Sequence, residues 1–331
     1  MPPPIREPFV IIGTSFLDVR TPSDPGGSGC VRGCVTVCPG GCGRNLAEDL
    51  ARLDCEVRLV STVGDDPAGR LLRAELERFG VDLRWLRLLP GVPTGSFVAT
   101  TGPRGGVRRA VVDCRCRSAL DAALLEQLLP QALEGAGTVV AEFGLPPRAL
   151  DCVSDLAARG DLPLCLDLAR ARQAAGRLDA ARHAALLKGN LSEARCLLGA
   201  GTAAGGDPLA AAQALSRELG VDTLVTGGAW GCALALGRPG GQEAYRLTHA
   251  ALEAADPSGA GDALLAGVLY ALARGLPWPR ALEVGTTAAR LAISTLTSCP
   301  EDLSVASVSN SPGDVRVAHI QATREPQPPD R

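Results

Sequence analysis

Apolar residues along the chain follow two alternating patterns: short runs that end in a glycine or a polar residue, and longer stretches with helical spacing. The short runs predict strands at residues 9–13, 56–63, 138–142, 162–168, 185–188 and 223–226. The longer stretches predict helices at residues 45–53, 67–79, 209–219, 262–274 and 279–297. From residue 120 onward helix and strand alternate, which is typical of a parallel sheet with helices on both faces. We therefore expect an α/β fold with a doubly wound, mostly parallel sheet.

Three other regions have no helical period and indicate further β-structure. Residues 20–38 are rich in Gly, Pro, Val and Thr, as expected of loop and exposed strand. Residues 92–113 alternate around glycine pairs and predict hairpin strands. Residues 231–236 and 245–247 predict a closing pair of strands.

The 331 residues allow one large α/β domain or two smaller ones. The helix–strand alternation falls within residues 9–298, which we expect to form one domain. Residues 1–8 are predicted to be a flexible N-terminus. Residues 299–331 have no sustained apolar period and end in Gln-Pro-Gln-Pro-Pro-Asp-Arg, so we expect a partly disordered tail.

The composition favours a protein with a large hydrophobic core. Hydrophobic residues make up 46% of the chain, and the formal net charge is −3. The sequence has no basic stripe, which argues against a nucleic-acid polymer as partner. The apolar stretch 263–273 is shorter than the roughly 20 residues that span a bilayer, and the N-terminus lacks the apolar core of a signal peptide. We therefore expect a cytoplasmic protein with no membrane partner.

Twelve cysteines are present, and four of them recur at every fourth position: Cys30, Cys34, Cys38 and Cys42. The intervening Val-Arg-Gly, Val-Thr-Val and Pro-Gly-Gly disfavour a helix that would gather them on one face. On a strand, four residues span about 13 Å, too far for neighbouring thiolates to share one zinc ion. The sequence therefore argues against a metal site here.

The heptapeptide Asp-Pro-Ser-Gly-Ala-Gly-Asp at 256–262 stands directly before an apolar helical pattern. The first turn of a helix has backbone N–H groups without intrahelical partners, and glycines let that backbone approach a bound anion. Beside such an anion site, Asp262 suits a base that takes a proton from a hydroxyl group attacking phosphorus. A plain turn before a buried helix would use the same residues, so this motif alone does not decide the function.

Further sites marked by glycine or a polar residue lie at strand ends or helix starts, where α/β folds bind ligands. In chain order the series is Asp18, Gly40-Gly41-x-x-x-Asn45, Asn190-x-x-Glu193, Thr226-x-Gly228-x-x-Gly231 and Gly259-Ala260-Gly261-Asp262. This series resembles the ribokinase-like, or PfkB, family of carbohydrate kinases over residues 9–298. The resemblance implies a ribokinase-like fold with a small β-lid from segments 18–40 and 92–113. It also implies an ATP-dependent kinase of a sugar or nucleoside.

The resemblance assigns roles to the matching positions. Asp262 corresponds to the catalytic base, and Gly259, Ala260 and Gly261 correspond to an anion hole for the transferring phosphoryl group. Contacts with ATP are implied for Thr226, Gly228 and Gly231, and Ser258 either donates a hydrogen bond in the anion loop or shapes its turn. Asn190 and Glu193 correspond to a motif that organises Mg²⁺ and phosphate, with Glu193 acting on the metal through water.

Sugar hydroxyl contacts are implied for Asp18, Gly40, Gly41 and Asn45. Asp256 corresponds to a position that helps to bind a monovalent cation, here K⁺, but Pro257 replaces the usual Thr and removes a backbone N–H. Potassium dependence therefore stays open. Each polar residue also has a structural alternative, namely a strand-end turn, a hairpin or a helix cap.

The segment around Asn45 resembles the pseudouridine kinases within the family, because Arg44 stands directly before Asn45 and Glu48 follows Ala47. Thr94, followed by Gly95, fits the substrate-covering strands of that group. The implied reaction is phosphorylation of the 5′-hydroxyl of pseudouridine by ATP. A helix-face ion pair between Arg44 and Glu48 is the structural alternative. Ribose, other nucleosides and keto-sugar acids are the competing substrates.

Other classes of protein fit less well. A dinucleotide-binding dehydrogenase needs a G-x-G-x-x-G turn after its first strand, and the chain has Gly-Thr-Ser-Phe-Leu-Asp there. None of the three histidines lies in a hydrolase motif. A non-catalytic member that binds a nucleoside remains an alternative to the kinase. By analogy with the family, the lid is also expected to form a contact between two copies of the chain.

Overall fold

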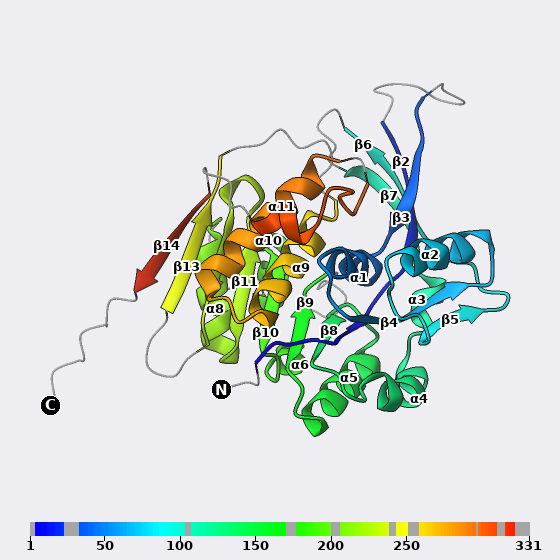
Figure 1. The fold of residues 1–331 in the computed structure, drawn as a ribbon, viewed down its shortest axis with the longest axis horizontal. Coiled ribbons are helices and arrows are strands. Elements are labelled where there is room, and N and C mark those ends of the chain that lie inside the picture. Colours follow the sequence, from blue (N-terminus) through cyan, green and yellow to red (C-terminus); the bar gives the residue numbers. More distant parts are fainter. Residues whose placement is uncertain are drawn as a thin grey trace, which may run out of the picture.

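A ten-stranded sheet forms the centre of the molecule (Figure 1). The computed structural model describes residues 4–22, 33–102, 107–169, 177–199, 206–237, 243–250, 258–295, 297–309 and 315–321. Seven adjacent strands run parallel, in the order β11 (Asp222–Thr226), β10 (Leu186–Asn190), β9 (Leu164–Asp167), β8 (Thr138–Glu142), β1 (Phe9–Ile12), β4 (Val57–Gly64) and β5 (Leu86–Leu89). Three antiparallel strands extend the other edge: β12 (Cys232–Ala235), β13 (Glu243–Thr248) and β14 (Arg316–Gln321). The predicted doubly wound α/β fold is confirmed.

Helices cover both faces of this sheet, and β1 shows why. Phe9 and Ile11 enter one hydrophobic core, whereas Val10 and Ile12 enter the other, because successive side chains of a strand point to opposite faces. The first core packs against α1 (Cys42–Arg52), α2 (Pro67–Arg78), α9 (Ala260–Ala273), α10 (Trp278–Ile293) and α11 (Val305–Ser309). The second packs against α4 (Ala122–Ala132), α5 (Pro147–Arg159), α6 (Leu178–Ala181), α7 (Leu191–Leu198) and α8 (Pro208–Leu219). Burial on both faces explains why the central strands are continuous apolar runs.

Helix α9 is apolar on nearly every side, since it lies against α10, α1 and the sheet. Its first turn carries Asp262, and residues 263–269 that follow are all buried. Because α9 is packed on several sides, the position of its first turn, and with it that of Asp262, is fixed.

A second, four-stranded sheet projects from the upper right of the molecule in Figure 1. Its strand order is β3 (Thr36–Gly40), β2 (Phe16–Pro22), β6 (Gly95–Thr101) and β7 (Val107–Asp113). The predicted hairpin within 92–113 is present as antiparallel β6 and β7, which are followed by the short helix α3 (Arg115–Ser118). This small sheet is built from the two segments that were expected to form a lid.

One face of the small sheet carries a row of valines. Val37, Val19, Val98 and Val111 are paired laterally across all four strands, and all but Val19 are strongly exposed. Asp18 and Arg20 alternate with Val19 and are buried on the opposite face. The polar face therefore points into the protein, while an apolar face lies on the surface.

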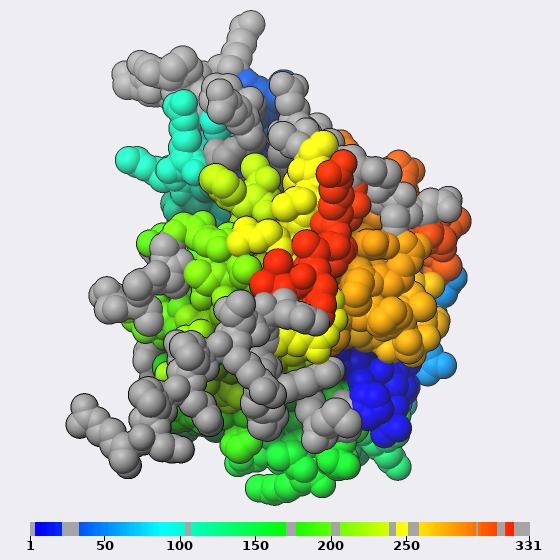
Figure 2. All heavy atoms as spheres, turned by 90° about the vertical axis from the view of Figure 1, so that its left-hand side faces the viewer, coloured from blue at the N-terminus to red at the C-terminus, as the bar shows by residue number. Residues whose placement is uncertain are grey.

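Ordered structure continues beyond the predicted domain limits of 9 and 298. At the N-terminus, Arg6 N donates to Thr138 Oγ1 at 2.9 Å, and Glu7 forms an ion pair with Arg274. At the C-terminus, β14 pairs with β13 and lies along the surface shown in Figure 2, in red between yellow β13 and orange α10. Part of each segment that was assigned to a flexible end is therefore packed against the domain, whereas residues 322–331 lie outside the described residues.

Among the helices that the structure describes, none combines the length and the apolar character needed to cross a bilayer. Within the same residues, no group of three or more His, Cys, Asp or Glu side chains is arranged to hold a metal ion. Cys34 is exposed and Cys38 is buried, while Cys30 lies outside the described residues.

Candidate active site

Four adjacent parallel strands end in polar residues: Glu142 on β8, Asp167 on β9, Asn190 on β10 and Thr226 on β11. In the sheet register Glu142 lies opposite Asp167, and Asn190 lies opposite Thr226. Parallel strands bring their carboxyl ends to one edge, which is where open α/β sheets bind ligands. The register therefore collects these side chains along a single edge.

The N-terminus of α9 faces this edge. Gly259 precedes the helix with φ 79°, a left-handed conformation, and a Cβ there would overlap the carbonyl oxygen of Ser298. At Gly261 a Cβ would lie 2.9 Å from Lys188 Nζ. Both glycines thus allow close approach, and the free N–H groups of the first turn stand beside a buried ammonium. Such an arrangement favours a bound anion.

Asp262 lies in this first turn and is 7% exposed. Burial raises the pKa of its carboxyl to about 7, against the opposing effect of Lys188 and with a further contribution from Asp167. Asn45 Nδ2, on α1, donates to Asp262 Oδ2 at 2.9 Å. A carboxylate that titrates near neutral pH is well matched to take a proton from a hydroxyl group.

Two charged residues that the sequence analysis overlooked form the floor of the site. Lys188 Nζ donates to Asp167 Oδ2 at 2.8 Å, and both side chains are buried. Burial by itself would lower the pKa of Lys188, but the attraction of Asp167 and Asp262 raises it, so the ammonium stays charged. The available signal was position: each residue falls at the end of a predicted strand, where Asn190 and Thr226 were already recognised.

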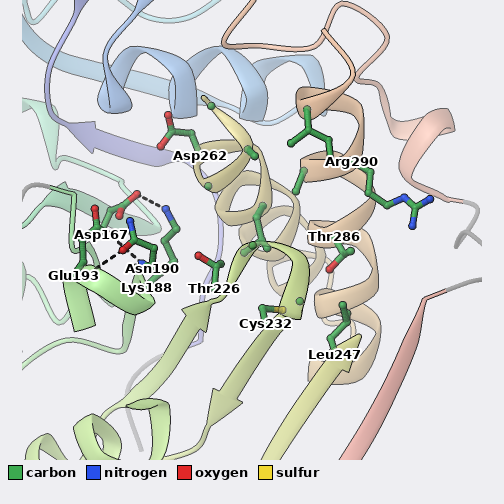
Figure 3. Close-up of a pocket in the computed structure, with 18 of the residues that line it drawn as sticks. Asp167, Lys188, Asn190, Glu193, Thr226, Cys232, Leu247, Asp262, Thr286 and Arg290 are labelled. Atoms are coloured by element: carbon green, nitrogen blue, oxygen red, sulfur yellow. Dashed lines mark hydrogen bonds and ion pairs between the residues drawn. The ribbon is translucent and has the colours of Figure 1, made fainter. Parts of the chain in front are cut away.

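A cavity of about 590 Å³ opens between the strand ends and α9 and α10 (Figure 3). One end is formed by polar and charged residues: Asp167, Lys188, Asn190, Glu193 and Asp262. The other end is lined by Cys232, Leu247 and Thr286, and the charged Arg290 also borders the cavity on this side. This division suits a ligand with an anionic end and a flat, weakly polar end.

Most residues predicted to contact the nucleotide line this cavity: Asn190, Glu193, Thr226, Gly228 and Gly231, together with Gly259, Ala260 and Gly261. Asn190 and Glu193 also cap α7, since Glu193 N donates to Asn190 Oδ1 and Asn190 N donates to Glu193 Oε2. The structural alternative is therefore realised, and both side chains still border the cavity. Ser258 is not among the lining residues, and Asp256 lies outside the described residues.

The residues predicted to contact sugar hydroxyls do not line this cavity: Asp18 is on β2, Gly40 ends β3, and Gly41 and Asn45 lie at the start of α1. Asp18 Oδ2 accepts from Arg20 Nη2 at 2.6 Å, and burial raises the pKa of Asp18 despite the opposing Arg20 charge. A Cβ at Gly40 would overlap the Asp18 carboxylate. Gly41 has φ 95° and lies against the Thr14 carbonyl oxygen, so both glycines are sterically required.

Arg44 and Thr94 do not line the cavity, and both engage protein partners. Arg44 forms an ion pair with Glu48 and hydrogen bonds to Asn45. Thr94 N donates to Asp66 Oδ2 at 2.7 Å, and Gly64 N donates to Thr94 Oγ1 at 2.9 Å. Thr94 thus ties the start of β6 to the turn before α2.

Glu142 is a further buried carboxylate that the sequence analysis did not single out. Its Oε1 accepts from Thr14 N at 2.6 Å, Thr14 Oγ1 at 2.8 Å and Gly43 N at 2.9 Å. Its Oε2 is buried and has no hydrogen-bond partner within the part of the chain that is described. Glu142 therefore joins the turn after β1 to the N-terminus of α1, and its charge also raises the pKa of Asp262.

Comparison with known proteins identifies the family. Residues 10–302 match the model of the pfkB family carbohydrate kinases. The chain is 31% identical over 280 residues to the uncharacterized sugar kinase YeiI of Escherichia coli, covering 82% of this chain and 74% of that protein. It is 28% identical over 318 residues to the pseudouridine kinase of the same organism, covering 92% and 96%.

Solved structures share the fold at low identity. Ribokinase from Giardia lamblia superposes with a TM-score of 0.77 at 19% identity, covering 91% of this chain and 97% of that one. Arabidopsis thaliana ribokinase, complexed with ribose and ATP, superposes with a TM-score of 0.72 at 22% identity, covering 93% and 98%. The ribokinase-like fold expected from the motifs is thus confirmed. The chain belongs to the pfkB family of carbohydrate kinases and is a kinase of a sugar or nucleoside.

Proposed function

We propose that the protein transfers the γ-phosphoryl group of ATP to the 5′-hydroxyl group of pseudouridine, with Asp262 as the base. The observation that carries the proposal is the place of Asp262: a buried carboxylate with a pKa of about 7, set in the first turn of a helix whose free N–H groups face an anion pocket. In the proposed step Asp262 takes the hydroxyl proton as the oxygen bonds to phosphorus. The bond from phosphorus to the leaving oxygen breaks, and ADP departs.

The cavity supports ATP as the phosphoryl donor. Its less polar end, where Cys232 and Leu247 lie, suits an adenine ring, and its polar end suits phosphates. The N–H groups of residues 259–261 and the Lys188 ammonium would stabilise the charge that develops on the transferred group. They act as fixed donors, so little reorganisation is needed during the reaction.

Magnesium fits the polar end as a partner of the phosphates. Mg²⁺ is usually held by one or two carboxylates together with substrate phosphates and water. Glu193 and Asp167 both line the cavity and offer such carboxylates. The ion would neutralise phosphate charge, while Asn190 and Glu193 orient its water ligands. A potassium site at Asp256 is proposed only by family resemblance, because Pro257 departs from the usual pattern.

Support for pseudouridine comes from the segment Gly40-Gly41-x-x-Arg44-Asn45 and from the relative that is named pseudouridine kinase and is matched over 92% of this chain. Another nucleoside, ribose or a keto-sugar acid is the alternative acceptor. The test is ADP release on a panel of these compounds with Mg-ATP, together with detection of the new phosphomonoester. Turnover of ribose but not of pseudouridine would redirect the substrate assignment and leave the kinase intact.

Replacement Asp262→Asn tests the chemistry. We expect kcat to fall by about 10²–10⁴-fold, the usual contribution of a general base, with ligand affinity largely kept. If ligands raise the melting temperature of the unmodified protein but ADP is not formed with any acceptor, the chain is a non-catalytic binder.

The valine row suggests that the small sheet also contacts a second copy of the chain. Val37, Val98 and Val111 are the exposed members of this row, on a sheet that corresponds to the family's lid. A second copy would cover these valines and steady the lid.

A further inference from the structure

Arg44 is buried in the first turn of α1, and its guanidinium is held by protein groups. Nη2 forms an ion pair with Glu48. Nη1 donates to Asn45 Oδ1 at 3.1 Å, Cys299 Sγ at 3.4 Å and Pro39 O at 3.4 Å. The other oxygen of Glu48 accepts from Arg52 Nε at 2.8 Å. The guanidinium is thus fixed in place from the helix behind it.

The contact with Asn45 sets the orientation of an amide group. Because Asn45 Oδ1 accepts from Arg44, its Nδ2 points the other way and donates to Asp262 Oδ2 at 2.9 Å. The flipped amide would place its oxygen against the carboxylate and its NH₂ against the guanidinium, so both contacts would be repulsive. Arg44 therefore makes one of the two amide orientations much more favourable.

We propose that Arg44 is a positioning residue: through Asn45 it keeps a hydrogen-bond donor on Asp262 and so holds the carboxylate ionised and aimed at the acceptor hydroxyl. The proposal rests on the proposed role of Asp262 as the base. In this proposal Arg44 does not contact the substrate, as was predicted from the sequence, but acts through its neighbour Asn45. The second hydrogen of Asn45 Nδ2 remains available for a substrate oxygen.

Several other charged or titratable groups act on Asp262 from the surrounding elements: Lys188 on β10, Asp167 on β9, Glu142 on β8, Cys42 and Asp49 on α1, and Cys299. Lys188 opposes the effect of burial, and the carboxylates add to it. Asn45 is the neutral group that donates a hydrogen bond to the Asp262 carboxylate. Loss of this bond would favour the protonated acid, which cannot act as a base.

A double-mutant cycle on kcat/KM separates this role from the alternatives. Arg44→Met is expected to lower kcat/KM at pH 7 by about tenfold, the loss of roughly one hydrogen bond, and to move the acid limb of the pH profile upward. Asn45→Leu should do at least as much. If Arg44 acts through Asn45, the double variant is no worse than Asn45→Leu. Effects that multiply would overturn the proposal, because Arg44 would then act on substrate or Asp262 directly.

A readout that does not need turnover keeps this proposal distinct from the proposed function. The ¹³Cγ shift of Asp262, assigned with Asp262→Asn, reports its titration in the intact protein. We expect a higher pKa in Arg44→Met and no further rise when Asn45→Leu is already present. If the pKa of Asp262 is unchanged in Arg44→Met, the proposal is wrong even if activity falls. If the pKa rises as expected, the proposal is supported even if no acceptor is phosphorylated.

Arg44→Lys guards against a variant that does not fold. Lysine keeps the charge beside Glu48 but lacks the fork that reaches two partners at once. If Arg44→Met is unfolded, Arg44→Lys is expected to melt within a few degrees of the parent and still show the shifted acid limb. A parent-like pH profile in a folded Arg44→Lys variant would overturn the role of the guanidinium fork, because a single ammonium donor would then be enough to orient Asn45.

Discussion

Lys188 Nζ and Asp167 Oδ2 lie 2.8 Å apart on neighbouring parallel strands, and the ammonium lies beside Gly261 in the first turn of α9. Lys188 is the only lysine in the chain. A buried ammonium with a carboxylate partner can face a phosphate without the full cost of an unpaired charge. This pair therefore links the sheet to the proposed site of phosphoryl transfer.

Lys188→Met should weaken ATP binding. The KM for ATP is expected to rise by about 10- to 100-fold, since a hydrogen bond to a charged group contributes roughly 1.5–3 kcal/mol. The free energy of unfolding should fall by about 3–5 kcal/mol, because Asp167 is left buried without its partner. The double variant Lys188→Met/Asp167→Leu serves as the control: it should recover stability but not activity. Recovery of both would assign the pair a structural role alone.

Activity should depend on pH through Asp262. The base must be ionised, and its pKa is about 7, so kcat is expected to rise from pH 5 and level off above pH 8. Steady-state rates at saturating substrates, measured across this range, check the prediction. A flat profile between pH 5 and 8 would show that Asp262 is ionised throughout or does not act as the base.

The free energy of unfolding should change with pH in the direction opposite to activity. The folded state raises the pKa of Asp262 from 3.8 to about 7, so the folded protein holds a proton that the unfolded chain releases. The contribution of Asp262 to the free energy of unfolding therefore decreases as the pH rises from about 4 to 7. Compared with Asp262→Asn, the parent should lose stability over this interval in urea unfolding. A difference that is constant with pH would contradict the raised pKa.

Gly259→Ala and Gly261→Ala should separate folding from function. Alanine at 259 must adopt φ 79°, which costs about 1–2 kcal/mol, and also overlaps the Ser298 carbonyl, so a marked loss of thermal stability is expected. Alanine at 261 would instead place its Cβ 2.9 Å from Lys188 Nζ, which is the end of a side chain and not backbone. That variant should melt near the parent temperature but lose most of its activity. Equal stability of the two variants would contradict this account of the turn.

Thr94→Val tests whether Thr94 binds substrate or holds the fold. Its hydroxyl donates to Asp66 Oδ1 at 2.6 Å and accepts from Gly64 N, so its loss should cost about 1–3 kcal/mol of stability. Thr94→Ser should restore most of that stability. If the role is structural, the KM for the acceptor stays close to the parent value in both variants. A large rise in KM for Thr94→Val alone would support the predicted substrate contact.

Val98→Asp should disrupt the proposed contact between two copies. A charge in the middle of the exposed valine row cannot be buried against a second sheet without a large penalty. Sedimentation or light scattering should show a dimer for the parent and a monomer for the variant. Leu71→Asp, at another exposed apolar position on α2, is the matched control and should remain dimeric. A monomeric parent would dismiss the dimer.

The strands and helices of the domain were largely predictable, because their apolar spacing is local information. Residues 138–142 form β8 as predicted, and the predicted strand 223–226 forms most of β11. Strands β5 and β14 were not predicted, since each is a short edge strand whose identity depends on the neighbour it pairs with.

Within the site, the sequence by itself determined where the glycine turns lie and that Asp262 stands at the start of a helix. Backbone conformation and the chemistry of a helix end follow from neighbouring residues. The tertiary structure alone decided which charges meet there. Asn45 and Asp262 are 217 positions apart and are joined only because α1 packs against α9. Lys188, Asp167 and Glu142 come together only through the register of parallel strands. Whether the pKa of a carboxyl group stays low or lies near neutrality depends on its burial and on the charges around it, and no local sequence pattern contains that information.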